Sequence, residues 1–506
     1  MTDTTLTTAP PSAHAASDDR MNARDRSVLT LLLISTFVVI LNETIMGVAL
    51  PSLMADLSIS ASAGQWLTAA FMLTMAVVIP ITGFLLQRFN TRPMFIAAMS
   101  LFSVGTLVAA IAPGFTVLLL ARVIQASGTA IMFPLLITSA ITLVPEKTRG
   151  RVMGNISIVI SVAPAIGPII SGIILSSLSW RFMFVVVLPI SVAALIVGGI
   201  LMKNITTPRK TRIDVLSVIL SALGFGGLVY GLSNLGTPGA SAYATLLPLV
   251  VGGVALVAFI LRQFSLQRRD AALLDLRTFT SRNFTFSIIM FGIAMMSMFG
   301  TIVLLPIYMQ NVIHISPVNT GLLLLPGGLL MGLLAPIVGR IYDRIGPTAL
   351  LVVGSIIVSA DLWGMTLLTA TSSFWWVLAA HVALSVGLAL IFTPLFTASL
   401  ASLKPELYSH GSAVVGTIQQ VAGAAGIALF VTIFTARQAA LAGQGASNEI
   451  AIAGGFHNAI LVGAIISVLA IVAAVFIRKQ PSSQFEGAEF DGAEFEGTGQ
   501  GAPAGH

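Results

Sequence analysis

The sequence predicts an all-α integral membrane protein with fourteen transmembrane helices. Its 506 residues are 56% hydrophobic and only 9% charged, and its mean hydropathy is +0.98. Soluble domains carry about 25% charged residues, so this composition excludes a soluble globular protein. The second observation is the number of long apolar stretches, and the third is the distribution of positive charge between them.

Fourteen apolar stretches are each long enough to cross about 30 Å of hydrocarbon as a helix. The first six are 27–50, 65–86, 93–112, 115–143, 152–176 and 180–202. Two further stretches, 214–235 and 243–263, lie in the middle of the chain. The last six are 284–311, 316–340, 347–370, 374–400, 411–436 and 457–478.

The positive charges are strongly asymmetric about these spans. If the N-terminus is cytoplasmic, 22 of the 25 Lys and Arg residues fall on cytoplasmic segments. Only Arg181 and Arg437 fall on the outer side, and Arg122 lies within the fourth span. The positive-inside rule then predicts a multi-pass protein of the cell membrane with both termini in the cytoplasm. Adding or removing one span in mid-chain would destroy this asymmetry, which supports the count.

Several classes of function are excluded by composition and missing motifs. Without Cys, the chain forms no disulfides, Fe–S clusters or thiolate metal sites. The net charge of +6 lies in membrane-flanking loops, so we expect no nucleic-acid partner. No GxxxxGK[ST] stretch is present, so the chain has no P-loop with which to hydrolyse ATP. An intramembrane enzyme would need clustered His, Asp, Glu and Arg near a membrane face, and no such cluster occurs.

A weak internal repeat divides the chain. The segment 83–92 follows the second span and 339–346 follows the tenth, and both are tight, basic turns after a Gly-ended helix. Such recurrence is expected of two homologous bundles around one pathway. We therefore predict six-helix bundles over 27–202 and 284–478, with two inserted helices in 203–263.

The flanking and connecting segments have distinct compositions. We expect 1–26 to be a disordered cytoplasmic N-terminus, because it lacks the apolar core of a signal peptide. The segment 264–283 has apolar residues at helical spacing between charges, which predicts an amphipathic helix at the membrane surface, with an ordinary charged linker as the alternative. The small, polar stretch 436–455 is typical of an extracellular loop. The acidic, Gly-rich tail 479–506 is predicted to be disordered.

Acidic residues inside apolar spans are the first candidates for function. Of the 19 acidic residues, only Glu43 and Asp361 lie clearly inside such spans. A charged side chain at the centre of a membrane helix costs about 2.5–3.5 kcal/mol on insertion scales. We therefore expect Glu43 to face a water-accessible cavity and to bind and release a proton, the alternative being a cap or ion pair at the helix end. Asp361 is the second candidate, either assisting cation binding or facing an outer vestibule.

Three motifs carry a family resemblance. The stretch Leu41–Pro51 reads LNETIMGVALP, Leu118–Ala130 reads LLLARVIQASGTA, and Ala163–Gly172 reads APAIGPIISG. They resemble the motifs of helices one, four and five in the fourteen-helix drug:proton antiporter family (EmrB/QacA type) of the major facilitator superfamily. Asn42 replaces the usual acid of the first motif, beside Glu43, a form closest to the lincomycin-resistance subgroup. The resemblance runs from about Leu31 to Phe476.

The resemblance implies the major facilitator fold and a function. It implies a proton-coupled exporter of amphipathic or cationic drugs that works by alternating access and needs no cofactor besides the coupling proton. Its expected partners are small drug-like molecules, protons and membrane lipids, and we expect a monomer. The helix-five motif favours export. A carrier of one specific metabolite in either direction is the main alternative, and a non-transporting sensor is a second.

The same resemblance implies sites. Buried Arg122 is expected either to control the ionisation of a neighbouring acid or to form a static structural pair. The expected cavity lining is Asn42, Glu43, Met46, Arg122, Gln125, Met132, Tyr308 and Gln310. In helix five, Gly167, Pro168 and Gly172 are expected to form a gate where that helix meets the opposing bundle, because small residues permit close backbone approach.

The cytoplasmic loop motif departs from the family pattern in the first half of the chain. The family form GxLaDRxGRR has Asp where this chain has Gln87, and Asn90 replaces the second Gly. The usual Asp-to-Arg lock therefore lacks its carboxylate there, which leaves Arg88 and Arg92 to meet the partner bundle or helix ends. The motif positions, better preserved in the second half, are Gly83, Arg88, Arg92, Gly339, Asp343, Arg344 and Gly346.

The predicted topology is testable with reporter fusions. Fusions at Ser241 and Gln444 should report the outer side, and a fusion at Arg209 should report the cytoplasm, because fourteen crossings place these segments there. Paired phosphatase and fluorescent-protein reporters at each position provide the measurement. A cytoplasmic signal at Gln444 would contradict the count.

Overall fold

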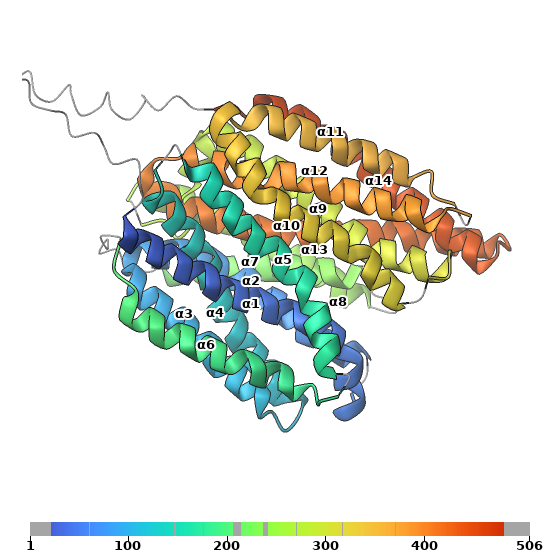
Figure 1. The fold of residues 1–506 in the computed structure, drawn as a ribbon, viewed down its shortest axis with the longest axis horizontal. Coiled ribbons are helices and arrows are strands. Elements are labelled where there is room, and N and C mark those ends of the chain that lie inside the picture. The colour runs from blue at the N-terminus through green and yellow to red at the C-terminus, as the bar shows by residue number, and fades with distance from the viewer. Residues whose placement is uncertain are drawn as a thin grey trace, which may run out of the picture.

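A computed structural model describes residues 22–59, 61–145, 148–175, 177–205, 214–235, 241–269, 271–315, 317–369 and 371–479. This part of the chain contains fourteen long α-helices and no β-strand, and the helices run side by side (Figure 1). By length and composition, thirteen of them are long and apolar enough to span a membrane. The one helix outside this set is α5. Helices are the expected solution, because hydrocarbon offers the backbone no hydrogen-bonding partner outside the helix itself.

The first six helices pack into one bundle. They are α1 (Ala23–Asp56), α2 (Ala61–Arg88), α3 (Thr91–Ala110), α4 (Phe115–Leu143), α5 (Arg149–Leu175) and α6 (Arg181–Leu201). Helix α4 packs against α2 and α3, while α1 packs against α5. Helix α4 is the most deeply buried of the six, and every residue from Gly128 to Ile141 is buried.

The last six helices form the second bundle. They are α9 (Arg282–Asn311), α10 (Pro317–Ile345), α11 (Pro347–Met365), α12 (Phe374–Ala401), α13 (Tyr408–Gly443) and α14 (Asn448–Phe476). Between the bundles in sequence lie the inserted helices α7 (Val215–Leu235) and α8 (Ala242–Gln267). Helix α7 contacts α2 of the first bundle and α13 of the second, while α8 packs mainly on α7.

Several helices begin at a serine that caps the first turn. Ser241, Ser281, Ser373 and Ser447 each accept a hydrogen bond from the backbone N–H three residues later. A helix start leaves four backbone N–H groups without an intrahelical acceptor, and such a cap satisfies one of them. The sequence thus specifies where α8, α9, α12 and α14 begin.

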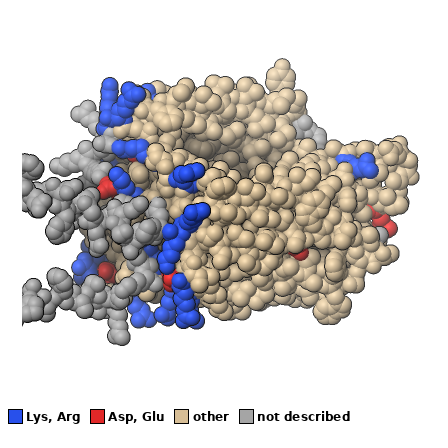
Figure 2. Space-filling view, turned by 90° about the horizontal axis from the view of Figure 1, so that it is seen from above, with Lys and Arg blue, Asp and Glu red and all other residues tan. Residues whose placement is uncertain are grey.

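Positive charge gathers at one end of the molecule, called the basic end here (Figure 2). This end carries the turns α2–α3, α4–α5, α8–α9, α10–α11 and α12–α13, and the end of α14. Arg181 lies at the opposite end, where it forms a 3.0 Å ion pair with Asp56. Hydrogen bonds from Trp180 and Arg181 hold the pKa of Asp56 below its ordinary value. The predicted segregation of charge is thus visible, while its cytoplasmic assignment stays a prediction.

Most helix limits agree with the apolar spans, but the expected N-terminal segment and the expected loop 436–455 differ. Helix α1 already begins at Ala23, inside the expected N-terminal segment, whose residues 1–21 lie outside the described part. The expected loop 436–455 is mostly helical, because α13 continues to Gly443 and α14 begins at Asn448. Alanine-rich sequence favours helix even where it is polar enough to leave the membrane. Residues 480–506 of the tail also lie outside the described part.

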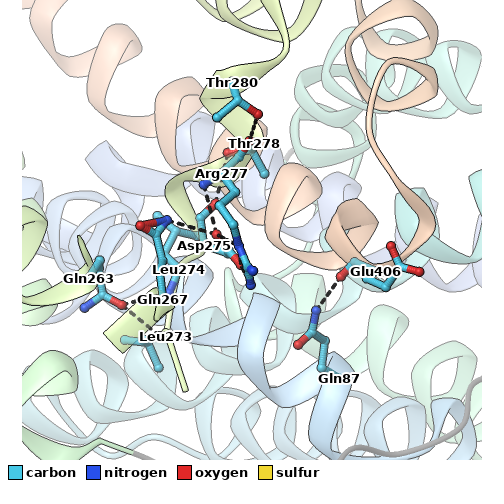
Figure 3. A network of polar contacts seen from close by, with 10 residues as sticks. All are labelled: Gln87, Gln263, Gln267, Leu273, Leu274, Asp275, Arg277, Thr278, Thr280 and Glu406. Atoms are coloured by element: carbon cyan, nitrogen blue, oxygen red, sulfur yellow. Dashed lines mark hydrogen bonds and ion pairs between the residues drawn. The ribbon is translucent and has the colours of Figure 1, made fainter. Parts of the chain in front are cut away.

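The expected amphipathic helix over 264–283 is wrong. Helix α8 extends to Gln267, the chain then runs without regular structure, and a short 3₁₀ helix, η2, covers Leu276–Thr280. The apolar residues Ala272, Leu273 and Leu274 are buried against protein. Asp275 is buried as well and caps η2 by accepting from the Arg277 N–H (Figure 3). The helical spacing of the apolar residues therefore reflects burial in an irregular segment, held by side-chain hydrogen bonds.

The two bundles meet closely near the basic end. The Thr138 and Ser412 hydroxyls lie 2.7 Å apart between α4 and α13, and Thr393 of α12 donates to Ser157 of α5 at 2.9 Å. Each of these residues lies within the half of its helix nearer the basic end. The bundles are thus in direct contact on this side of the molecule.

Candidate functional site

The core of the first bundle is organised about a buried guanidinium. Arg122 of α4 is 1% exposed, and its Nη1 donates to Asn42 Oδ1 of α1 at 3.4 Å and to Gln125 Oε1 at 3.1 Å. Its Cζ lies 4.2 Å from the ring centroid of Phe71 on α2, a cation–π geometry. Its Nε has no hydrogen-bond partner. Arg122 thus joins α1, α2 and α4.

Gln125 extends this cluster to α3. Its Nε2 donates to Thr106 Oγ1 at 2.8 Å, and Thr106 in turn donates to the Phe102 carbonyl at 2.7 Å. Glycines allow the approach: a Cβ on Gly105 would lie 2.7 Å from Gln125 Cγ, and one on Gly128 would lie 2.5 Å from the Ala98 carbonyl oxygen. We call Asn42, Phe71, Thr106, Arg122 and Gln125 the Arg122 cluster.

Glu43 lies beside this cluster rather than in it. It is half-buried on α1, whereas its neighbour Asn42 is 2% exposed. Arg122 attracts the Glu43 carboxylate electrostatically, but no ion pair within 4.0 Å joins them in the described part of the chain. Adjacent helix positions point about 100° apart, which explains why Asn42 takes the contact and Glu43 does not. Glu43 is therefore a half-buried acidic residue close enough to the incompletely paired Arg122 to be attracted by its charge.

Other expected cavity residues are placed differently. Met46 and Met132 are buried in the core of the first bundle, 2% and 0% exposed, as ordinary packing residues are. The expectation for Tyr308 is wrong: it is fully buried, stacks on Phe456 at 4.7 Å between centroids, and donates to the Thr369 carbonyl at 2.6 Å. Gln310, at the end of α9, is exposed. These two residues thus lie apart from the Arg122 cluster.

Asp361 is buried in the second bundle. It is 9% exposed on α11, a helix that packs against α12 and α14, and its Oδ2 has no hydrogen-bond partner. The structure does not bring it together with Glu43. His381 of α12, by contrast, is satisfied, since its Nε2 lies 3.0 Å from the Leu324 carbonyl oxygen of α10.

The helix-five glycines do not meet the opposing bundle. Gly167 packs against Thr44 of α1, in its own bundle, and a Cβ on Gly172 would meet open space. Pro168 lies within α5, but its side chain falls outside the described residues. The expected gate position is therefore wrong for both glycines. The Gly167 contact nevertheless lies next to Glu43, because Thr44 follows it in sequence.

Earlier glycines of α5 make the contact between bundles instead. A Cβ on Gly150 would lie 2.5 Å from the Gly339 carbonyl oxygen, and one on Gly154 would lie 2.5 Å from that of Ala335, both on α10. Farther along, Val162 packs against Gly332. Sequence reasoning missed this interface, although Gly150 and Gly154 have the small-xxx-small spacing that favours close packing of membrane helices.

The two loop motifs fasten the bundles unequally. Asp343 of α10 accepts hydrogen bonds from the Gly150 N–H at 2.7 Å and the Arg151 N–H at 3.0 Å, so it caps the start of α5 across the interface. A carboxylate at a helix N-terminus contributes about 0.3–1 kcal/mol, and up to about 2 when partly buried. In the first half, Gln87 of α2 only donates to the Glu406 carbonyl, at 2.6 Å. The capping carboxylate is thus present on one side only.

The remaining motif residues hold turns and helix ends. A Cβ on Gly83 would lie 3.0 Å from Ala413 Cβ, so α2 and α13 approach closely there, and Gly346 has φ +81°, which ends α10 ahead of Pro347. Arg92 donates to the Gly199 carbonyl at 2.5 Å, at the end of α6 in its own bundle. Arg88 lies with its Cζ 5.8 Å from the Phe89 ring centroid, and Arg344 is exposed.

The fold and motifs match known proteins. The sequence model of the family described as Major Facilitator Superfamily matches residues 32–427. The chain belongs to the major facilitator superfamily. It is 42% identical over 463 residues to the uncharacterized MFS-type transporter YcnB of Bacillus subtilis, covering 91% of this chain and 97% of that protein.

Resistance proteins are among the transporter's relatives. It is 38% identical over 457 residues to the lincomycin resistance protein LmrB of Listeria monocytogenes, covering 89% and 96% of the two chains. The human organic anion transporter MFSD10 (TETRAN) has a TM-score of 0.62 with 13% identity, covering 90% of this chain and all of that one, which shows the shared fold. The protein is thus a multi-pass membrane transporter rather than an enzyme.

The Arg122 cluster predicts that guanidinium geometry, beyond charge, is needed at this position. Arg122→Lys keeps the charge but loses the planar group that bonds Asn42 and Gln125 and covers Phe71. We expect transport in liposomes to fall by about tenfold or more and thermal unfolding to shift to lower temperature. Gln310→Ala, an exposed control, should change neither. Wild-type transport by Arg122→Lys would contradict this role.

The glycine interface predicts a second, matched pair of variants. Gly154→Leu forces a side chain into the Ala335 carbonyl and should prevent the bundles from meeting, so transport should be lost while membrane insertion persists. Gly172→Leu places the same side chain in open space on the same helix and should be tolerated. Efflux at equal protein incorporation is the measurement. Equal activity of the two variants would show that close contact at Gly154 is dispensable.

Proposed function

We propose that the transporter exports amphipathic or cationic drug-like molecules in exchange for protons, by alternating access, without another cofactor. The observation that supports this proposal most is Glu43, a half-buried acidic residue inside a membrane helix and next to the incompletely paired Arg122. Ionisable groups at such positions in membrane helices mark ion and substrate pathways. The similarity to lincomycin and multidrug resistance proteins supports a drug-like substrate.

Competition for one carboxylate gives the coupling mechanism. A proton or a cationic substrate neutralises Glu43, and loss of either leaves an anion attracted to Arg122. Exchange results when the two ligands favour opposite-facing states, because each shifts the conformational equilibrium by its differential affinity. The membrane potential adds about 2.3 kcal/mol per charge for each 100 mV, with the pH gradient in addition.

The proposed orientation follows from charge. If the basic end faces the cytoplasm of a plasma membrane, both termini are cytoplasmic, as the positive-inside rule requires. The close contact between bundles near that end then corresponds to a state closed toward the cytoplasm. Release of substrate to the outside and uptake of a proton from there belong to this state.

A carrier for one specific metabolite is the second candidate. The similarity to the uncharacterized YcnB, greater than that to the resistance proteins, leaves room for it. The two candidates differ in substrate range. Efflux of several unrelated amphipathic cations from proteoliposomes supports the multidrug function, and efflux of a single compound class supports the alternative.

Glu43 provides the decisive test. Glu43→Gln keeps size and hydrogen bonding but cannot ionise, so pH-gradient-driven efflux should fall by about tenfold or more, while substrate binding persists. Glu43→Asp should retain partial activity with a shifted pH optimum. The measurement is transport in liposomes with an imposed pH gradient at equal protein incorporation.

Asp361→Asn is the matched control, because it also removes an acid from an apolar span. We expect it to retain most of the coupled transport, since Asp361 lies in α11, apart from the Arg122 cluster. Undiminished exchange by Glu43→Gln together with its loss in Asp361→Asn would transfer the coupling role to Asp361.

A further inference from the structure

The inserted helices α7 and α8 are joined to each other by a charged pair at the basic end. Arg262 of α8 donates to Asp214 through Nε at 2.6 Å and Nη2 at 2.7 Å. Asp214 also caps α7 by accepting from the backbone N–H and hydroxyl of Ser217. The hydrogen bonds from Arg262 hold the pKa of Asp214 well below its ordinary value, so the carboxylate stays charged. The two helices are thus fastened as one unit.

Gln263 carries this connection into the segment that follows α8. Its side chain is fully buried, and its Nε2 donates to Ser217 Oγ at 2.8 Å. Its Oε1 accepts from the backbone N–H of Leu273 at 2.8 Å and of Leu274 at 3.3 Å (Figure 3). One buried amide thereby joins α7, α8 and the segment 271–275. Removing it would leave buried backbone N–H groups without an acceptor, which is costly.

Asp275 fixes the same segment a second time. It is 3% exposed and accepts from Gln267 at the end of α8, at 2.9 Å, and from the Arg277 guanidinium at 2.6 Å. His410 of α13 lies close enough to attract it electrostatically. The segment is thus bonded to α8 through Gln267 and attracted to His410 of the second bundle.

Phe279 of η2 and Ser281, which follows it, complete the connection to the second bundle. The Phe279 ring packs edge-to-face on Phe284 of α9, with 5.5 Å between centroids. Ser281 caps α9, and its hydroxyl donates to Ser402 at the end of α12, at 2.9 Å. Hydrogen bonds thus link α7 to α8 and α8 to the segment 271–275, and Ser281 links the start of α9 to the end of α12.

The direct contacts of α7 with both bundles are apolar, unlike the polar connections that lead from α8 toward the second bundle. Val229 of α7 lies in one apolar cluster with Ala76 of α2 and Ala424 of α13, and a Cβ on Gly226 would lie 3.1 Å from Val77 Cγ2. Nearer the opposite end, Trp66 and Tyr230 lie 5.4 Å apart between ring centroids. Apolar contacts between membrane helices gain no hydrophobic driving force over lipid, so they can be exchanged at low cost.

We propose that the inserted pair moves as one rigid body with the second bundle, and that α7 slides along α2 when the bundles rock. This inference rests on the proposed alternating access. The polar connections of α8 and segment 271–281 assign the pair to the second bundle. The apolar surface between α7 and α2 is the one that changes during the cycle.

A matched pair of cross-links tests this assignment. The chain has no native Cys, so introduced cysteines are its only thiols. Val229→Cys combined with Ala424→Cys joins α7 to the second bundle, and Val229→Cys combined with Ala76→Cys joins it to the first. Oxidation of the α7–α13 pair should leave transport within about twofold of the reduced protein. Oxidation of the α2–α7 pair should reduce transport by about tenfold or more, with recovery on reduction.

A third pair separates this inference from the function on which it rests. Thr138→Cys with Ser412→Cys spans the two bundles, and its oxidation should block transport if access alternates. Transport that continues with this pair oxidised refutes alternating access, whatever α7 does. Should the Ala76 variant fail to fold, Gly226→Cys with Val77→Cys provides another α2–α7 pair.

The remaining outcomes contradict the assignment directly. A block by the α7–α13 cross-link but not by the α2–α7 cross-link would place the inserted pair with the first bundle. A block by both would make the pair a third moving body. A block by neither would show that α7 does not change its contacts during transport.

Discussion

The buried charge of Arg122 constrains the first bundle more than any other interaction. Moving such a group to the centre of a membrane costs about 2.5–3.5 kcal/mol on insertion scales, so the surrounding helices must supply compensation. Asn42 supplies it from α1, Phe71 from α2 and Gln125 from α4 itself, and Thr106 of α3 holds Gln125 in place. Four helices are thereby fixed about one guanidinium. The neutral partner Asn42 leaves the charge unneutralised by direct contact, and that residual field acts on Glu43.

Asn42 and Glu43 have different structural roles beside Arg122. In the family motif that it resembles, an acid occupies the position of Asn42. Here the amide takes the structural contact and the acid stands one position further along the helix, half-buried. A carboxylate bonded directly to Arg122 would be held ionised by that contact, whereas one attracted from a greater distance can gain and lose a proton more easily. In the proposed mechanism, the substitution thus separates the residue that anchors Arg122 from the residue that binds the proton.

The sequence is sufficient to predict the fold and the charged residues that lie inside the apolar spans. Span limits followed from hydropathy, because each helix must satisfy its own backbone groups in hydrocarbon. The site was harder to predict. The periodicity of apolar residues predicts a surface helix over 264–283, but the Gln263 and Asp275 side chains bind backbone N–H groups of that segment and hold it irregular, which periodicity does not reveal. A small residue permits close helix packing but does not indicate which helix it packs against. Gly167 therefore packs against Thr44 of its own bundle, where the sequence predicts contact with the opposing bundle.

Tyr308 illustrates the same limit in the second bundle. An aromatic side chain suits a cavity for varied apolar ligands, but Phe456 and the Thr369 carbonyl, both distant in sequence, enclose Tyr308. Rotation of a helix about its axis decides such questions, and a helix that is apolar all round gives little indication of rotation. Polar residues inside spans were more informative, since a buried polar group requires a partner.

The kind of polar contact differs between the interfaces within a bundle and those between the bundles, where two hydroxyl pairs, Thr138–Ser412 and Thr393–Ser157, and the Asp343 cap make the connection. Within the first bundle and along α7–α8–α9, buried amides, carboxylates and guanidinium groups connect neighbouring helices. Between α5 and α10, glycines of both helices lie in close contact with the opposite helix, and Asp343 caps α5 at one end. A surface of small residues packs well when closed and leaves few unsatisfied groups when opened, so the energetic difference between the two states stays small. Reversible movement requires such a balance, because an interface held by many buried polar bonds would stay shut.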